Sequence, residues 1–92
     1  MTTDIVIDSR NQRIRVLDYT AGSLVMLNEQ LESLAETNDA GKIILYARES
    51  DLSELQGLGW QMEGVMSGYF RGKPAFCLTR YPDPQRAQSD LT

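Results

Sequence analysis

The sequence predicts a small α/β (α+β) domain with the element order β-β-α-β-α-β-β, a mixed five-stranded sheet and two helices. Three features predict it: β-branched runs near the start of the chain, one leucine-striped segment, and turn residues between the periodic segments. A chain of 92 residues suits a single domain held without disulfides or a structural metal. We expect this domain to span residues 4–81, and the polar, proline-containing residues 82–92 to be a linker or flexible tail.

The first two strands are predicted to form a hairpin. Residues 4–8 and 13–17 are rich in β-branched side chains, and the polar residues 9–12 between them suit a turn. In the second strand Ile14 and Val16 alternate with arginines, so we expect one face to be buried and the other partly wet.

An amphipathic helix is predicted for residues 23–38, where apolar residues recur at steps of three and four. These apolar residues are Leu24, Leu27, Leu31, Leu34 and Ala35. Ser23 is the expected N-cap, and Gly41 the residue that tolerates a left-handed stop. Its outward acidic residues, Glu29, Glu32 and Glu36, favour plain solvation over a cation site.

The third strand is predicted at residues 42–47, a nearly continuous apolar run. Such a run is typical of a central strand covered on both faces, here parallel to the preceding strand through a right-handed crossover. Ser50 is the expected N-cap of a short second helix, which Gly57 and Gly59 bring to an end.

A second hairpin is predicted to close the domain. Its strands are residues 60–67 and 74–81, and residues 68–73 join them with a glycine near each end. We expect Trp60, at the start of the first of these strands, to be anchored in the core.

Composition excludes several classes of function. The chain has one cysteine and no histidine, which excludes an intrachain disulfide, zinc sites built from Cys and His, and an imidazole base. Its net charge of −4 disfavours nucleic acid as a partner. No apolar run reaches the roughly 20 residues of a membrane span, and the first residues lack a secretory signal, so we expect no membrane partner and a cytoplasmic location.

Three places could carry chemistry. The loop 18–23 before the first helix could bind a phosphate or pyrophosphate, but it holds one glycine, and ordinary capping is the favoured interpretation. Cys77 has no activating neighbour in sequence, which favours a buried structural cysteine. Tyr69, Phe70 and Arg71 either contact a ligand or neighbouring domain, or pack over the core.

With the elements placed, residues 42–47, the short helix, Gly59-Trp60 and the last hairpin resemble part of the Gcn5-related N-acetyltransferase (GNAT) fold. Over residues 4–81 the chain also resembles the amino-terminal region of the β-lysine N-acetyltransferases, which precedes their catalytic domain. The resemblance depends mainly on the string at residues 68–76 leading to Arg80-Tyr81, and less on Leu31, Leu34-Ala35, residues 42–44 and Gly59-Trp60.

The resemblance implies a partial GNAT fold used as an accessory domain. In that family the whole protein transfers acetyl from acetyl-CoA to the ε-amino group of β-lysine, which gives a compatible solute. The family's glycine-spaced pyrophosphate motif is not matched at residues 18–23, so the resemblance carries over no catalytic or cofactor-binding residue. It implies acetyl-CoA as cofactor of the full-length protein, with none bound by this segment.

Our first hypothesis is an accessory, non-catalytic domain that packs against a catalytic acetyltransferase domain in cis. The expected substrate-binding or interdomain contacts are Tyr69, Phe70, Arg71, Tyr46 and Arg48, the last two because ligands bind beyond the carboxyl ends of strands. The alternative is a stand-alone interaction module with a half-GNAT fold, whose partner is a second copy in a homodimer. A complete miniature acetyltransferase is the third possibility.

Overall fold

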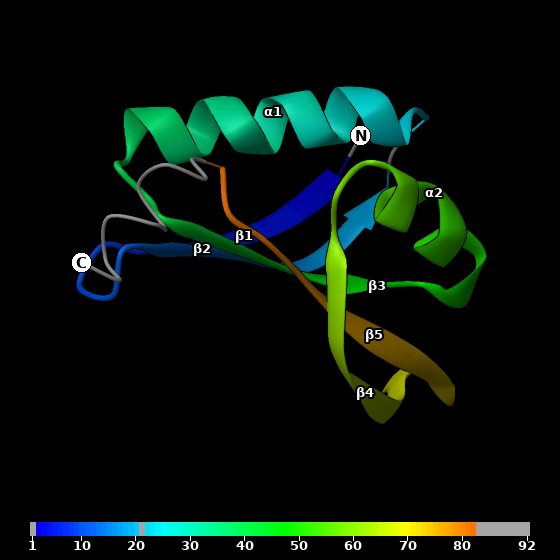
Figure 1. Ribbon diagram of the computed structural model, residues 1–92. Helices are drawn as coiled ribbons and strands as arrows, with labels where there is room; N and C mark the ends of the chain where they lie inside the picture. Colours follow the sequence, from blue (N-terminus) through cyan, green and yellow to red (C-terminus); the bar gives the residue numbers. More distant parts are fainter. Residues whose placement is uncertain (1, 21, 83–92) are drawn as a thin grey trace.

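The structure is a computed structural model that describes residues 2–20 and 22–82 (Figure 1). Its elements are β1 (Thr2–Asp8), β2 (Arg13–Thr20), α1 (Leu24–Thr37), β3 (Lys42–Ala47), a 3₁₀ turn η1 (Glu49–Asp51), α2 (Leu52–Gly57), β4 (Gln61–Phe70) and β5 (Lys73–Arg80). The predicted linker lies outside the described residues except for Pro82.

The strands form one five-stranded mixed sheet in the order β1-β2-β3-β5-β4. Strand β2 pairs with β3 in parallel, and the other neighbouring pairs are antiparallel. The fold class, the element order, the two helices and the parallel central strand predicted from the sequence are therefore confirmed.

Both helices pack on the same face of this sheet, the upper face in Figure 1. The leucine stripe of α1 covers Ile14 and Val16 of β2 and Ile43 and Leu45 of β3, all of which are fully buried. Trp60, directly before β4, lies in the same core, and its indole N–H donates to the side-chain oxygen of Asn28 on α1 at 2.9 Å. Trp60 therefore anchors its strand as expected and also links the two helical segments.

The other face of the sheet has no covering layer in the part of the chain that the structure describes. Along β3, Ile43, Leu45 and Ala47 are buried, whereas Ile44 and Tyr46 are only half-buried. The expectation of a strand covered on both faces is wrong for these residues, because both helices lie on one side. We call the uncovered side the open face.

Strand β2 is longer than predicted and takes in half of the expected 18–23 loop. Residue Thr20 pairs with Thr2, and the register of the β1–β2 pair shifts between Asp4 and Ile5. This bulge leaves Leu17 without a partner across the ladder, since Asp4 pairs with Asp18 and Ile5 with Val16. The loop was expected to begin at residue 18, because a bulge that lets the strand continue has no simple sequence signature.

The ends of the helices differ from prediction in two places. Ser23 caps α1 as expected, with its hydroxyl accepting from the Met26 N–H at 3.3 Å. The left-handed residue after α1 is Asp39 (φ 54°), not Gly41, whose N–H instead donates to the Gln12 carbonyl at 2.8 Å. Ser50 is not a cap, because it lies inside the 3₁₀ turn that leads into α2.

The last hairpin is tighter than predicted. Strand β4 continues to Phe70, which pairs with Lys73, so the turn consists of Arg71 and Gly72 alone. Gly68 adopts a positive φ of 70° within the irregular stretch between Met66 and Phe70, which lets the strand resume after it. Gly68, which was predicted to begin the connection between the two strands, thus lies within β4.

Candidate functional site

The candidate site lies where the two parallel strands separate. Pairing between β2 and β3 covers only residues 13–16 and 42–45, although β2 continues to Thr20 and β3 to Ala47. The bulge at Leu17 lies at the start of this separation. In open α/β sheets, ligands bind beyond the carboxyl ends of the strands, where neighbouring strands diverge.

Arg48 bridges this gap from the end of β3. Its guanidinium donates to the Tyr19 carbonyl and to the Asp18 carboxylate, each at 2.6 Å. It also lies against the rings of Tyr19 and Phe70, at 4.7 and 4.8 Å from the ring centroids. The side chain is therefore held on two sides by rings and at its tip by oxygen acceptors.

Tyr19 fixes the base of the gap. Its side chain is buried, and its hydroxyl donates to Asp51 at 2.6 Å while accepting from the Arg48 backbone N–H at 3.1 Å. Burial, and then the hydrogen bond to the Asp51 carboxylate, raises the pKa of Tyr19 to about 12. Its phenol therefore stays protonated at neutral pH and does not serve as a general base.

Tyr69 reaches across the open face from β4. Its hydroxyl donates to the Leu17 carbonyl at 2.8 Å, and its ring lies 5.2 Å from that of Tyr46 and 4.9 Å, edge-on, from that of Phe70. Burial raises the pKa of the Tyr69 hydroxyl. The carbonyl that the bulge frees is thus already occupied by this chain's own side chain.

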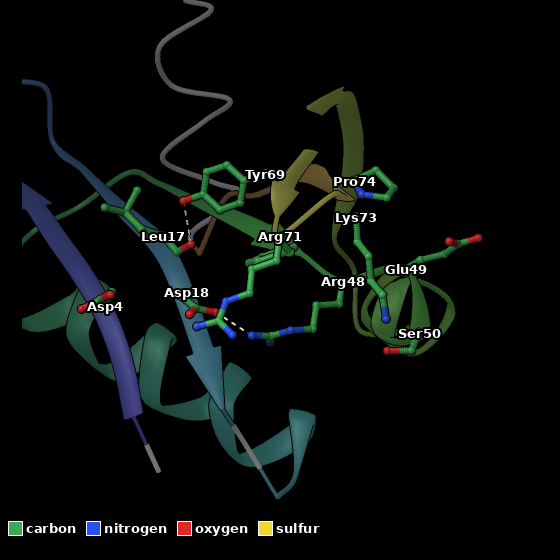
Figure 2. A pocket seen from close by; sticks show the side chains of 11 residues that line it. Asp4, Leu17, Asp18, Arg48, Glu49, Ser50, Tyr69, Arg71, Lys73 and Pro74 are labelled. Atoms are coloured by element: carbon green, nitrogen blue, oxygen red, sulfur yellow. Dashed lines mark hydrogen bonds and ion pairs between the residues drawn. The ribbon is translucent and has the colours of Figure 1, made fainter. Parts of the chain in front are cut away.

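These groups border a wide cleft of about 1230 Å³ (Figure 2). We call it the hairpin cleft, because the β4–β5 turn forms one wall and the ends of β2 and β3 form the other. The residues that line it are Asp4, Leu17, Asp18, Arg48, Glu49, Ser50, Tyr69, Phe70, Arg71, Lys73 and Pro74. In Figure 2, Arg71 extends toward Asp18 beside Arg48, and Lys73 extends toward Ser50.

The structure brings together all five residues singled out from the sequence. Arg48, Tyr69, Phe70 and Arg71 line the hairpin cleft, and Tyr46 packs behind Tyr69. Sequence reasoning missed Tyr19, Asp51 and Lys73 as parts of this site. Lys73 is the last residue of the predicted connection 68–73 and could have been found there. The Tyr19–Asp51 contact joins residues 32 positions apart and has no local signal.

The other sequence candidates remain outside the cleft. Cys77 is half-buried rather than buried, because it lies on the open face opposite Tyr46. Burial, and then the nearby Glu63 carboxylate, raises the pKa of its thiol. That direction lowers the thiolate fraction and agrees with an unactivated cysteine.

The described residues also bear on metal binding and on membrane insertion. Across residues 2–20 and 22–82, no group of three or more cysteines, aspartates or glutamates is arranged to hold a metal ion. Neither α1 nor α2 has the length and apolar character needed to cross a bilayer. Before α1, Ser23 acts as the cap predicted for it, and Ala21 of the same loop lies outside the described residues.

Comparison with known proteins relates the chain to acetyltransferases, although no protein-family model matches it. It is 34% identical over 83 residues to the N-acetyltransferase YodP of Bacillus subtilis, covering 90% of this chain and 30% of that protein. It is 34% identical over 56 residues to the β-lysine N(6)-acetyltransferase of Methanosarcina mazei, covering 61% of this chain and 21% of that protein. The chain thus spans less than a third of either relative.

Comparison with solved structures concerns the fold. A nourseothricin acetyltransferase superposes with a TM-score of 0.70 at 14% identity, covering 88% of this chain and 56% of that structure. Ard1 from Thermoplasma volcanium superposes with a TM-score of 0.65 at 14% identity, covering 86% of this chain and 62% of that structure. In sequence the chain is therefore similar to a segment of two N-acetyltransferases, and its fold is that of acetyltransferases of the GNAT type.

Proposed function

We propose that this chain is a non-catalytic accessory segment of a GNAT acetyltransferase and packs against a catalytic acetyltransferase domain. The observation that carries the proposal is the bridged gap between β2 and β3. The Leu17 carbonyl is taken by Tyr69, and the Tyr19 carbonyl by Arg48. A cofactor entering this gap would have to displace both hydrogen bonds, and each displaced polar group would need a new partner.

The helix that follows the gap supports the same proposal. The Ser23 side chain already satisfies the Met26 N–H, one of the free amides at the start of α1. The approach to the helix contains a single glycine, Gly22, whereas the phosphate-binding turns of α/β folds usually carry several. We therefore propose that acetyl-CoA serves the full-length enzyme through another domain.

Two observations support the proposed partner: the apolar open face is uncovered in the described residues, and the relatives are much longer than this chain. The open face presents apolar side chains, among them Ile44 and Tyr46, without a covering layer in the described residues. The relatives extend well beyond the matched part, since the chain accounts for 30% and 21% of their lengths. A catalytic domain of the same protein or complex is the occupant that these two observations favour.

The acceptor is proposed to be a small amine, and β-lysine is the first candidate because one relative acts on it. The whole protein would then form an acetylated, compatible solute in the cytoplasm. The immunoprecipitation experiment described next tests both this substrate and the proposed partner.

Immunoprecipitation from cells that express the chain tests the accessory role. We expect acetyltransferase activity toward β-lysine, measured with labelled acetyl-CoA, to precipitate with the chain. An Ile44→Glu variant should bring down less activity, because it places a charge on the open face. Val25→Glu on the exposed side of α1 is the matched control and should change nothing. No activity toward any amine in the wild-type precipitate would contradict the proposal.

A homodimer is the second candidate, and edge strand β4 is the observation that favours it. Met62, Val65 and Met66 are exposed on this strand, which lies at the edge of the sheet and has no lysine or proline among its residues. Sedimentation velocity distinguishes the two candidates: a concentration-dependent dimer that Val65→Lys dissociates would support this one, and a monomer at all concentrations would exclude it.

A further inference from the structure

Arg15 lies on the open face of β2 between apolar neighbours. The residues on either side of it, Ile14 and Val16, are buried under the helices, so the alternation of side chains along a strand places Arg15 on the opposite side of the sheet. Arg15 pairs with Val6 of β1 and with Ile44 of β3. Because paired residues of neighbouring strands point to the same face, the half-buried Arg15 is flanked by an apolar side chain on each side.

Two further cations lie on the open face, and both have a carboxylate partner. Arg13 pairs with Asp8 at 3.2 Å, and Lys42 lies 3.9 Å from Glu63. Arg15 forms neither an ion pair nor a side-chain hydrogen bond with the part of the chain that the structure describes. This is so although the chain carries 13 acidic residues against 9 basic ones.

The chemistry of a cover for this face follows from the unpaired guanidinium. A layer that buries Ile44 and Val6 also removes Arg15 from water, which costs free energy unless the layer supplies an acceptor. The guanidinium presents parallel N–H groups that match the two oxygens of a carboxylate. The complementary surface is therefore apolar and carries an aspartate or glutamate opposite Arg15.

The charge of Arg15 also decides between two occupants of the open face. In a dimer whose two-fold axis passes through this part of the face, each Arg15 would approach the other copy's Arg15. Like charges brought together in an apolar interface disfavour such a dimer. A different domain has no such conflict, and the relatives have room for one, since the chain accounts for 30% and 21% of their lengths.

We propose that Arg15 is the charged anchor of a docking surface for the catalytic domain, which rests on the accessory role proposed above. The catalytic domain covers Val6 and Ile44 with apolar side chains and places one carboxylate against the Arg15 guanidinium. An arginine inside an apolar patch is a common centre of binding energy in protein interfaces.

Arg15→Met separates docking from folding, because methionine keeps an unbranched apolar stem and removes the charge. The isolated variant should melt no lower than the wild type, since the wild-type guanidinium has no partner to lose. Immunoprecipitated acetyltransferase activity, measured with labelled acetyl-CoA, should be about tenfold lower than with the wild type. Arg10→Met, in the exposed β1–β2 turn, is the matched control and should precipitate as much activity as the wild type.

Cross-linking locates the partner carboxylate directly. The lysine introduced by Arg15→Lys keeps the positive charge, and a water-soluble carbodiimide joins its amine to a carboxylate in contact with it. Mass spectrometry of the precipitate should show residue 15 linked to an aspartate or glutamate of an acetyltransferase. The same treatment of Arg10→Lys should give no such link.

Three results would overturn the docking surface and leave the accessory role standing. The first is activity that precipitates equally with Arg15→Met and with the wild type. The second is a link from residue 15 to a carboxylate of this chain, in the same copy or in a second one. The third is the absence of any link from residue 15 in a precipitate that contains activity. A wild-type precipitate without acetyltransferase activity would instead contradict the accessory role, and the docking surface with it.

Discussion

The two faces of strand β3 differ in how fully the rest of the fold covers them. On the helix side, Ile43, Leu45 and Ala47 are entirely buried by α1 and α2. On the open side, Ile44 and Tyr46 carry side chains of the same apolar kind but remain half-buried. Because the strand is apolar on both faces, its sequence suits a sheet with layers on both sides, and the described residues supply only one.

Matched substitutions in β3 should give the largest difference between the faces. Leu45→Ala deletes a side chain from the closed core and should cost about 2–5 kcal/mol of unfolding free energy. Ile44→Ala, one residue away, should cost clearly less, because its surroundings are already partly open to water. Urea unfolding of both variants measures the difference, and equal losses would show that the open face is packed as tightly as the helix face.

The pH dependence of stability should reveal the buried phenol of Tyr19, which lies at the base of the gap between β2 and β3. The folded-state pKa of Tyr19, about 12, lies above its ordinary value of 10, so the contribution to stability is present below pH 10 and is lost between pH 10 and 12. The unfolding free energy should fall by up to about 1.4 kcal/mol per pH unit in that window. In Tyr19→Phe this part of the slope should be absent. An unchanged slope in the variant would contradict the assignment.

The smallest expected effect concerns Cys77, which lies on the open face. Its raised thiol pKa and half-buried position should make reaction with a disulfide reagent at pH 8 slower in the folded chain than in urea. The Cys77→Ala variant should change stability by less than about 1 kcal/mol, since little surface is lost from the core. A folded-state rate equal to that in urea would mean that the open face gives this thiol no protection.

Much of the helix side could be predicted from the sequence, because its signals are local. The leucine spacing of α1, the Ser23 cap and the apolar run of β3 each depend on neighbouring residues, and each is found where it was expected. The helix stop was misplaced because Asp39 takes the left-handed conformation that is more common for glycine. Asparagine and aspartate are the side chains that tolerate that conformation best.

The gap and the cleft were only partly predictable, because they depend on contacts between distant segments. The expected residues Arg48 and Tyr69 do lie there, but their acceptors, the carbonyls of Tyr19 and Leu17, are 29 and 52 residues away. Those carbonyls are free only because a bulge and a short parallel ladder separate β2 from its neighbours. Neither feature leaves a pattern in the sequence.

Titration of the isolated chain with acetyl-CoA, followed through backbone amide shifts, tests the bridged gap most directly. We predict no saturable shifts at Leu17, Tyr19, Gly22 or Ser23, because Arg48, Tyr69 and the Ser23 cap already occupy the groups that a cofactor would use. Saturable shifts at these four residues, accompanied by rupture of the Arg48 and Tyr69 hydrogen bonds when the cofactor binds, would contradict it.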